Sequence, residues 1–147
     1  MTDRTFVDTN VLVAATTPAR AEHAAALAAL HDGFSGRTLV LSGQVVREYL
    51  SVATRPAAQN GLGLPHPAAL TNVRAFLDRA LCLDEDARVR EAFFTLLAAV
   101  PCLGKQVHDA NIAATMIAHR IPRILTLNGA DFLRFSVWVS VVSPLSR

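Results

Sequence analysis

The sequence has few cysteines and no long apolar run. Its two cysteines, Cys82 and Cys102, form neither a CxxC pair nor a dense framework, which argues against a metal–thiolate centre and a disulfide scaffold. We expect both to be buried thiols. The longest apolar stretches, 93–103 and 137–142, are too short or too interrupted to cross about 30 Å of hydrocarbon. No membrane span is therefore predicted.

Charge is also sparse, at 18% of the residues, whereas 52% are hydrophobic, so the 147-residue chain is expected to fold compactly as one domain, 1–147. The net charge of +2 does not by itself indicate a nucleic-acid partner. Thirteen of the fourteen basic residues are arginine, a bias that we attribute mainly to a GC-rich genome. Asp3, Arg4 and Asp8 lie where a secretory signal would be apolar, so we expect a cytoplasmic protein.

Strands and helices are expected to alternate along the chain. Short apolar runs predict strands, and longer runs with helical spacing predict helices, one of which is opened by Thr17 and Pro18. This order predicts an α/β fold with three layers, α/β/α, around a central, mostly parallel sheet. The predicted strands are 4–7, 37–41, 123–127 and 137–142; the predicted helices are 11–15, 19–31, 43–54, 68–81, 86–100 and about 108 to 121, with a loop at 57–66 and one turn at 130–135.

Four of the twelve acidic residues occupy positions that are unusual for charges whose only role is to keep the protein soluble. Asp8 follows the first strand, and Asp131 follows the turn that closes another apolar strand. Glu48 borders the apolar stripe of helix 43–54, and Asp109 opens a helix of small and apolar residues. Because open α/β sheets bind ligands at the carboxyl ends of their strands, the four carboxylates are expected to meet at that edge.

Each acid also has a purely structural interpretation. Asp8 can cap the helix that follows it, and Asp109 can interact favourably with the helix dipole at the start of its helix. Glu48 can be a partly exposed helix residue, and Asp131 can be an ordinary turn residue. The functional interpretation therefore depends on the set of four rather than on any one of them.

Carboxylates brought within a few ångströms of one another raise each other's pKa or recruit a cation. Mg²⁺ and Mn²⁺ prefer oxygen ligands, and the sequence has no histidine or cysteine cluster with zinc spacing. A divalent ion can orient and polarise a phosphate and supply hydroxide. The pattern thus predicts phosphodiester hydrolysis.

Four segments resemble the successive motifs of PIN-domain nucleases, most of all the VapC-type toxins of bacterial toxin–antitoxin pairs. They are Phe6-Val-Asp-Thr-Asn-Val-Leu-Val13, Gln44-Val-Val-Arg-Glu-Tyr-Leu50, Val107-His-Asp-Ala-Asn-Ile-Ala-Ala114 and Leu125-Thr-Leu-Asn-Gly-Ala-Asp-Phe132. Their order and spacing cover nearly the whole chain. The resemblance implies the PIN fold and a metal-dependent endoribonuclease.

By this resemblance, Asp8, Glu48, Asp109 and Asp131 match the acidic quartet that holds Mg²⁺ or Mn²⁺ and activates water for RNA cleavage. The resemblance also implies that three neighbouring polar residues orient metal-bound water or the acidic side chains; these are Asn10, Thr126 and Asn128. As structural alternatives, Asn10 caps a helix and Asn128 shapes a turn. Leu127 stands where many relatives carry a polar or basic residue. The family further implies a homodimer, an RNA substrate and a cognate antitoxin protein whose C-terminal tail covers the active-site groove.

His108 lies beside Asp109, but a metal-bound hydroxide needs no histidine base, so we interpret it as a structural residue at a helix entrance. Possible phosphate contacts lie on several elements, although each is equally explained as a solvated helix residue. These are Arg47, Arg55, Lys105 and Arg134.

Two rival functions remain open. The first motif also resembles the opening strand of haloacid-dehalogenase-like phosphatases, in which the aspartate is a nucleophile. That family has a second aspartate where this chain has Asn10, and a late pair of acids that residues 128–131 do not supply. The other rival is a PIN-like module that binds RNA or protein without catalysis, against which the presence of all four acids argues.

Overall fold

The computed structural model describes residues 3–36 and 38–145, with the side chains of 32–36 omitted, and its centre is a five-stranded sheet in the order β3-β2-β1-β4-β5. Every neighbouring pair of strands is parallel. The strands are β1 (Arg4–Val7), β2 (Thr38–Ser42), β3 (Leu81–Leu83), β4 (Arg123–Leu125) and β5 (Ser140–Val142).

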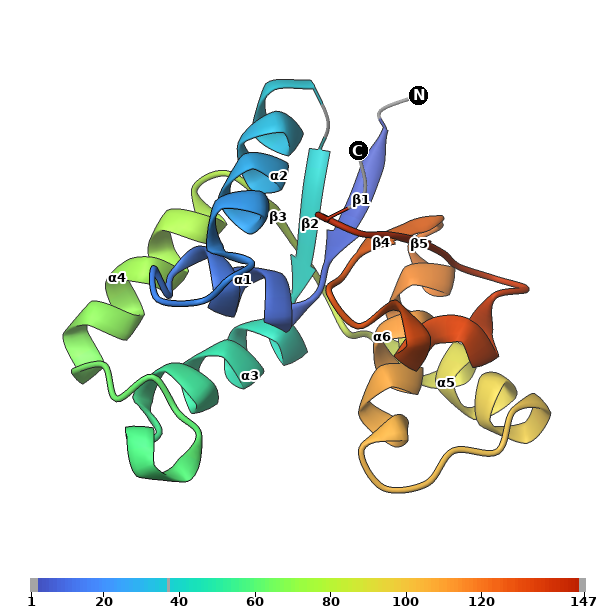
Figure 1. The fold of residues 1–147 in the computed structure, drawn as a ribbon. Helices are drawn as coiled ribbons and strands as arrows, with labels where there is room; N and C mark the ends of the chain where they lie inside the picture. Colours follow the sequence, from blue (N-terminus) through green and yellow to red (C-terminus); the bar gives the residue numbers. More distant parts are fainter. Residues whose placement is uncertain (1–2, 37, 146–147) are drawn as a thin grey trace.

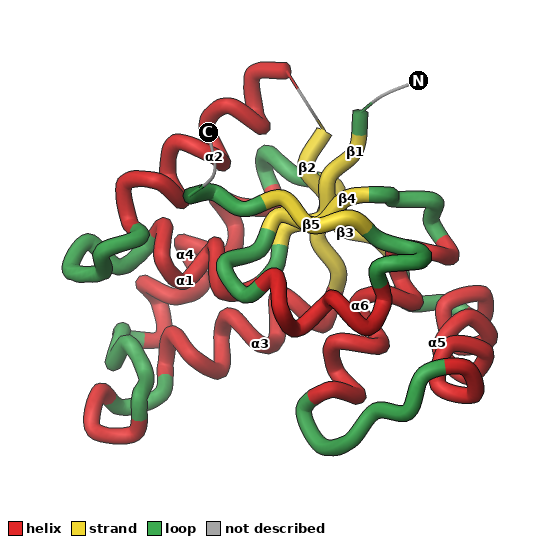
Figure 2. The backbone as a smooth tube through the Cα atoms, turned by 45° about the vertical axis from the view of Figure 1, so that its right-hand side comes forward, coloured by secondary structure: helices red, strands yellow, loops and turns green. Residues whose placement is uncertain are grey.

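Helices cover both faces of this sheet and make three layers, α/β/α (Figure 1). Helices α1 to α4 lie on one side, and α5, α6 and the 3-10 helix η2 lie on the other; Figure 2 shows the strands enclosed between the two groups. The predicted fold class is confirmed. The helices are α1 (Thr9–Ala15), α2 (His23–Gly36), α3 (Gly43–Thr54), α4 (His66–Leu77), α5 (Ala87–Ala99) and α6 (Gln106–Ala118), with 3-10 helices η1 (Ala57–Gln59) and η2 (Gly129–Phe135).

The three inner strands, β2, β1 and β4, are largely buried because helices cover both faces of the sheet. Phe6 at the centre of β1 is fully buried, and it pairs in register with Val40 of β2 and Ile124 of β4. Tyr49 fills the core beneath α3, and Phe132 and Phe135 anchor η2. Burial of each such side chain contributes about 1.5–3 kcal/mol. The core therefore fixes the strand ends, from which the candidate site residues project.

The predicted boundaries need several corrections. Strand β3 was not predicted, because it has three residues and lies at an edge of the sheet, with Leu81 and Cys82 exposed. The helix predicted over 68–81 ends at Leu77, before this strand. Cys82 is consequently exposed rather than buried, and Cys102 is half-buried. Sequence periodicity cannot mark a strand shorter than two full alternations.

Other differences lie at the ends of elements. The chain turns at 17–22, so α2 begins at His23 rather than directly after the Thr17-Pro18 pair. The last strand begins at Ser140 instead of residue 137, and β4 ends at Leu125 instead of 127. The loop predicted at 57–66 contains the 3-10 helix η1. Arg37, where the second strand was predicted to begin, lies outside the described residues. Among the described residues, no helix is long and apolar enough to span a bilayer.

Candidate active site

Asp8 lies at the carboxyl end of the central strand β1, where the main chain turns into α1. Its backbone N–H donates to the carbonyl of Leu125 at 3.0 Å, which continues the pairing of β1 with β4 by one residue. The Asp8 side chain then caps α1 by accepting from the N–H of Thr9 at 2.8 Å. The cap offered above as the structural alternative for Asp8 is thus present, and it occurs at the edge of the sheet where ligands bind in such folds.

The Asp8 carboxylate is buried, with 8% of the residue exposed, and is held by side-chain donors. Its Oδ2 accepts from the Thr126 hydroxyl at 2.8 Å and from the Asn10 amide at 3.2 Å. The predicted neighbours Asn10 and Thr126 therefore both contact Asp8 directly.

These neighbours also hold one another. The Asn10 amide donates to Thr126 Oγ1 at 3.1 Å, and Asn10 Oδ1 accepts from the N–H of Leu127 at 3.0 Å. The third predicted neighbour, Asn128, contributes its backbone N–H to Thr126 Oγ1 at 3.0 Å. The turn after β4 is thereby locked to the start of α1, so the orientation of the Asp8 carboxylate is set before any ligand binds.

Glu48 approaches the same edge from α3 and is half-buried. Its Oε2 accepts from the Thr9 hydroxyl at 2.8 Å, and its Oε1 accepts from the Gln44 side-chain amide at 2.8 Å. Thr9 bonds Asp8 through its backbone and Glu48 through its hydroxyl. One residue therefore links the first two predicted acids.

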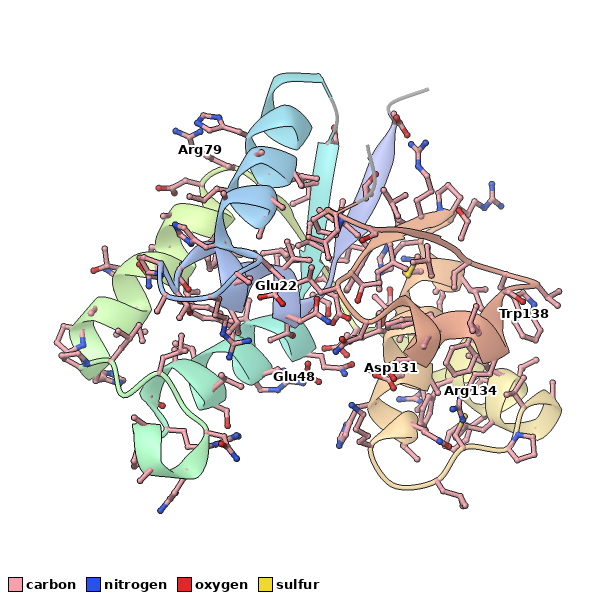
Figure 3. The ribbon with its side chains drawn as sticks, viewed as in Figure 1. Glu22, Glu48, Arg79, Asp131, Arg134 and Trp138 are labelled. Atoms are coloured by element: carbon pink, nitrogen blue, oxygen red, sulfur yellow. The ribbon has the colours of Figure 1, made fainter. Side chains whose placement is uncertain are left out.

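Asp109 lies in the first turn of α6, and Asp131 lies in the first turn of η2. Asp131 Oδ2 forms an ion pair with Lys105 Nζ at 3.6 Å. In Figure 3, Glu48 on α3 and Asp131 on η2 lie on the side of the sheet where β1 ends, and Arg134 follows Asp131 along η2.

The electrostatics connect all four acids. Burial raises the pKa of Asp8 to about 6; hydrogen bonds from Thr126 and Thr9 oppose this rise, and the charges of Glu48 and Asp109 add to it. Burial also raises the pKa of Asp109, with the charge of Asp131 as the next cause and that of Glu48 a further one. The charges of Glu48, Asp109 and Asp131 thus each raise the pKa of another acid in the set.

Two cations partly offset this negative field, since Lys105 and Arg134 both lower the pKa of Asp109. Arg47 instead lies 3.6 Å from Glu85, and Arg55 donates to the hydroxyl of Ser51. Of the four predicted phosphate contacts, the structure therefore brings Lys105 and Arg134 to the acids.

The side chains of the four acids do not converge on one point in the structure. Within the part of the chain that the structure describes, no three aspartate, glutamate, histidine or cysteine side chains are grouped closely enough to hold a metal ion. The chemistry of the donors nevertheless suits a hard cation, because the acids at this edge offer carboxylate oxygens and repel one another. A cation bound here would have to draw them closer together.

Several polar residues at this edge were not singled out from the sequence. Thr9 and Gln44 hold Glu48, and Glu85 accepts from the backbone N–H of Gln44 at 3.1 Å. Glu85 follows the unpredicted strand β3, so its position could not be inferred. Thr9 and Gln44 lie within quoted motifs, and the spacing of Gln44 four residues before Glu48 is the signal that could have identified it. His108 is exposed and meets the site through its backbone carbonyl, which accepts from Gln44 at 2.9 Å.

Comparison with known proteins identifies the family to which this fold belongs. The PIN domain family matches residues 5–137. The chain therefore belongs to the PIN domain family. No match was found among curated proteins.

Solved structures share the fold at low sequence identity. A chain of VapBC2 from Rickettsia felis, in complex with a DNA fragment from its promoter, superposes with a TM-score of 0.71 at 17% identity, covering 95% of this chain and 98% of that one. VapC20 from Mycobacterium tuberculosis, described as a toxin that cleaves the sarcin–ricin loop, gives 0.67 at 18% identity, covering 92% and 95%. A chain of FitAcB from Neisseria gonorrhoeae gives 0.64 at 21% identity, covering 97% and 99%.

Proposed function

We propose that this protein is a metal-dependent endoribonuclease and the toxin of a toxin–antitoxin pair. The observation that carries the proposal is the electrostatic coupling among Asp8, Glu48, Asp109 and Asp131 near the carboxyl edge of the sheet, where two of them have raised pKa values. A set of acids that a fold holds together against their own repulsion is typical of a site for a divalent cation. Membership of the PIN family and similarity to toxin structures support the same assignment.

In this proposal the four acids hold Mg²⁺ or Mn²⁺, which when bound polarises the scissile phosphate and lowers the pKa of a water molecule. Thr126 and Asn10 keep the Asp8 carboxylate turned to the edge of the sheet, while Thr9 does so for Glu48. No covalent intermediate with the protein is required. A nucleophilic role of Asp8, as in the phosphatase alternative, is also disfavoured because Asn10 stands where that family has its second aspartate.

Lys105 and Arg134 are assigned to the RNA backbone. Both lie close enough to affect Asp109, and both are exposed, so they can meet a phosphate at the rim of the acidic site. Guanidinium and ammonium groups of this kind contribute affinity for RNA without selecting a base. The particular RNA is then chosen by shape and by single-stranded loops, as is usual for protein–RNA recognition.

The partners follow from the same assignment. A matched structure from Klebsiella pneumoniae is a toxin–antitoxin complex, and by this likeness we assign the chain an antitoxin partner. We also assign it a homodimeric state, as the resemblance of its motifs to PIN-domain toxins implies. An RNA target places the active protein in the cytoplasm. A small upstream reading frame that encodes a protein with a DNA-binding N-terminus would support the pairing, and co-purification of its product with this chain would test it.

The decisive experiment measures RNA cleavage by purified protein free of antitoxin, with Mn²⁺ or Mg²⁺ and with EDTA. We expect cleavage that needs the cation and that Asp8→Asn abolishes. Asp78→Asn is the matched control, because Asp78 is exposed at the end of α4 and should leave cleavage unchanged. Absence of cleavage by the wild type, or full cleavage by Asp8→Asn, would refute the proposal and favour a PIN module that only binds.

The substrate can be found by sequencing the new 5′ ends that appear in total RNA when the protein is induced. The control is induction of Asp109→Ala, which removes one acid of the set. We expect a small number of sites to appear with the wild type and to be absent with the variant. Identical 5′ ends in both would mean that another nuclease makes them.

A further inference from the structure

Gln44 is a buried polar residue at the start of α3, directly after the carboxyl end of β2. It is 6% exposed, and its side-chain amide lies between α3 and α6. A buried primary amide no longer forms hydrogen bonds with water, so its two N–H groups and its carbonyl oxygen all need partners within the protein.

All of these needs are met within the site. Gln44 Nε2 donates to Glu48 Oε1 at 2.8 Å and to the carbonyl of His108 at 2.9 Å. Gln44 Oε1 accepts from the side-chain amide of Asn111 at 2.7 Å. The amide therefore joins the helix that carries Glu48 to the helical turn that carries Asp109.

Asn111 determines which way the Gln44 amide faces. Asn111 Nδ2 also donates to Glu85 Oε1 at 2.6 Å, which fixes it as a donor. If the Gln44 amide were flipped, its N–H groups would meet the Asn111 amide, and its oxygen would meet the Glu48 carboxylate and the His108 carbonyl. Every one of those contacts would be repulsive, so the network allows one orientation.

Both carboxylate oxygens of Glu48 therefore accept a hydrogen bond, Oε2 from Thr9 and Oε1 from Gln44, each at 2.8 Å. Two donors on opposite oxygens fix the plane of a carboxylate. Groups that orient a metal-binding carboxylate in this way commonly affect metal affinity by about 10- to 100-fold. The effect arises from the geometry of the ligand rather than from contact with the cation.

We propose that Gln44 is a positioning residue that orients Glu48 and ties it to the α6 turn of Asp109, so that the affinity of the site for a divalent cation depends on this amide. This inference rests on the proposed function, because it assigns Glu48 to the cation site. It adds a residue from outside the acidic set to that site.

The test replaces Gln44 with methionine, which keeps an unbranched side chain of similar length and removes both donors. We expect Gln44→Met to bind Mn²⁺ about 10- to 100-fold more weakly in titration calorimetry. The matched control is Asn72→Ala. Asn72 lies half-buried on α4, and its amide donates to the Tyr49 hydroxyl at 3.0 Å without bonding any of the four acids. That control should keep wild-type Mn²⁺ affinity.

A second variant keeps Gln44 in place. Asn111→Ala removes the bond that orients the amide, so we expect a smaller loss of Mn²⁺ affinity in the same direction, and it serves as the test if Gln44→Met does not fold. The pair Gln44→Met and Glu48→Gln should be non-additive, because removing Glu48 leaves Gln44 nothing to orient. A full additional loss in the Glu48→Gln background would overturn the inference.

The two proposals fail in different ways. If the wild type neither binds Mn²⁺ nor cleaves RNA, the proposed function is wrong. If the wild type does both, and Gln44→Met or Asn111→Ala binds Mn²⁺ as tightly as Asn72→Ala does, then the role of Gln44 alone is wrong. RNA cleavage at saturating Mn²⁺ gives an independent readout, since a residue that acts through metal affinity should recover much of its rate there.

Discussion

The two halves of the candidate active site differ in how firmly their acids are held. In the fixed half, Asp8 and Glu48 together accept five hydrogen bonds from neighbouring groups. In the open half, Asp109 and Asp131 lie with two exposed cations, and the ion pair of Asp131 with Lys105 spans 3.6 Å. The difference suggests that the fixed half defines where a cation sits, while the open half adjusts to the cation and to the substrate.

This comparison predicts unequal losses when one acid from each half is neutralised. Asp8→Asn should lower the RNA cleavage rate by on the order of 10³-fold, equivalent to about 4 kcal/mol of activation free energy. Asp131→Asn should lower it by about tenfold, because the open half can rearrange around what remains. Single-turnover rates with saturating Mn²⁺ measure both. Equal losses would mean that the halves are not distinct.

The pH dependence of stability should isolate the buried acid of the fixed half. Burial raises the pKa of Asp8 from its ordinary value of 3.8 to about 6, so between these pH values the folded state holds a proton that the unfolded state has already lost. In the metal-free protein, the contribution of Asp8 to the free energy of unfolding should therefore be greatest at or below about pH 4. It should fall by about 3 kcal/mol as the pH rises to about 6 and level off above that pH.

Denaturant unfolding of the metal-free protein between pH 4 and 7 measures this slope. Asp8→Asn should flatten it, because the asparagine has no proton to lose. Asp78→Asn, at an exposed position, should keep the wild-type slope. A slope that survives in Asp8→Asn would assign the pH dependence to other groups, of which Asp109 is the first candidate because its pKa is also raised.

The fold was predictable where patterns are long and local. Phe6 and Val7 before Asp8 mark a buried strand, and the spacing around Tyr49 marks a helix, so the sequence alone placed two acids at strand and helix positions that the structure retains. The set of four also came from the sequence. The edge strand β3 did not, because three residues with two exposed side chains have no readable alternation.

The hydrogen bonds around the acids could not be predicted for a different reason. Gln44 meets Asn111 across 67 positions, and Thr126 meets Asp8 across 118. Such contacts depend on the packing of helices whose relative positions are set by the whole core. These residue types are ordinary in helices and turns. The resemblance to PIN nucleases placed Thr126 beside the acids, whereas the contact of Gln44 with Asn111 becomes visible only in three dimensions.

A smaller effect should follow from loosening the fixed half without removing an acid. Thr126→Val deletes the hydroxyl that donates to Asp8 Oδ2 at 2.8 Å, at a cost of about 1 kcal/mol, and the pKa of Asp8 should rise further because that bond favours the charged form. The acidic limb of the cleavage profile should shift to higher pH. Thr115→Val, a buried hydroxyl bonded to the carbonyl of Asn111, is the control and should destabilise the chain without shifting the profile.

The smallest effect is expected in the open half, from its exposed lysine. Gly104, at φ 58° in the left-handed region that favours glycine, turns the chain so that Lys105 precedes α6 and reaches Asp131. Because Lys105 is 74% exposed, solvent and salt screen its charge, and Lys105→Gln should strengthen Mn²⁺ binding by about twofold at low salt and by less at high salt. Lys105→Arg should restore wild-type affinity for the cation, since it keeps the charge. Weaker Mn²⁺ binding by Lys105→Gln would instead show that this lysine organises the open half, and the contrast between the two halves would then lose its basis.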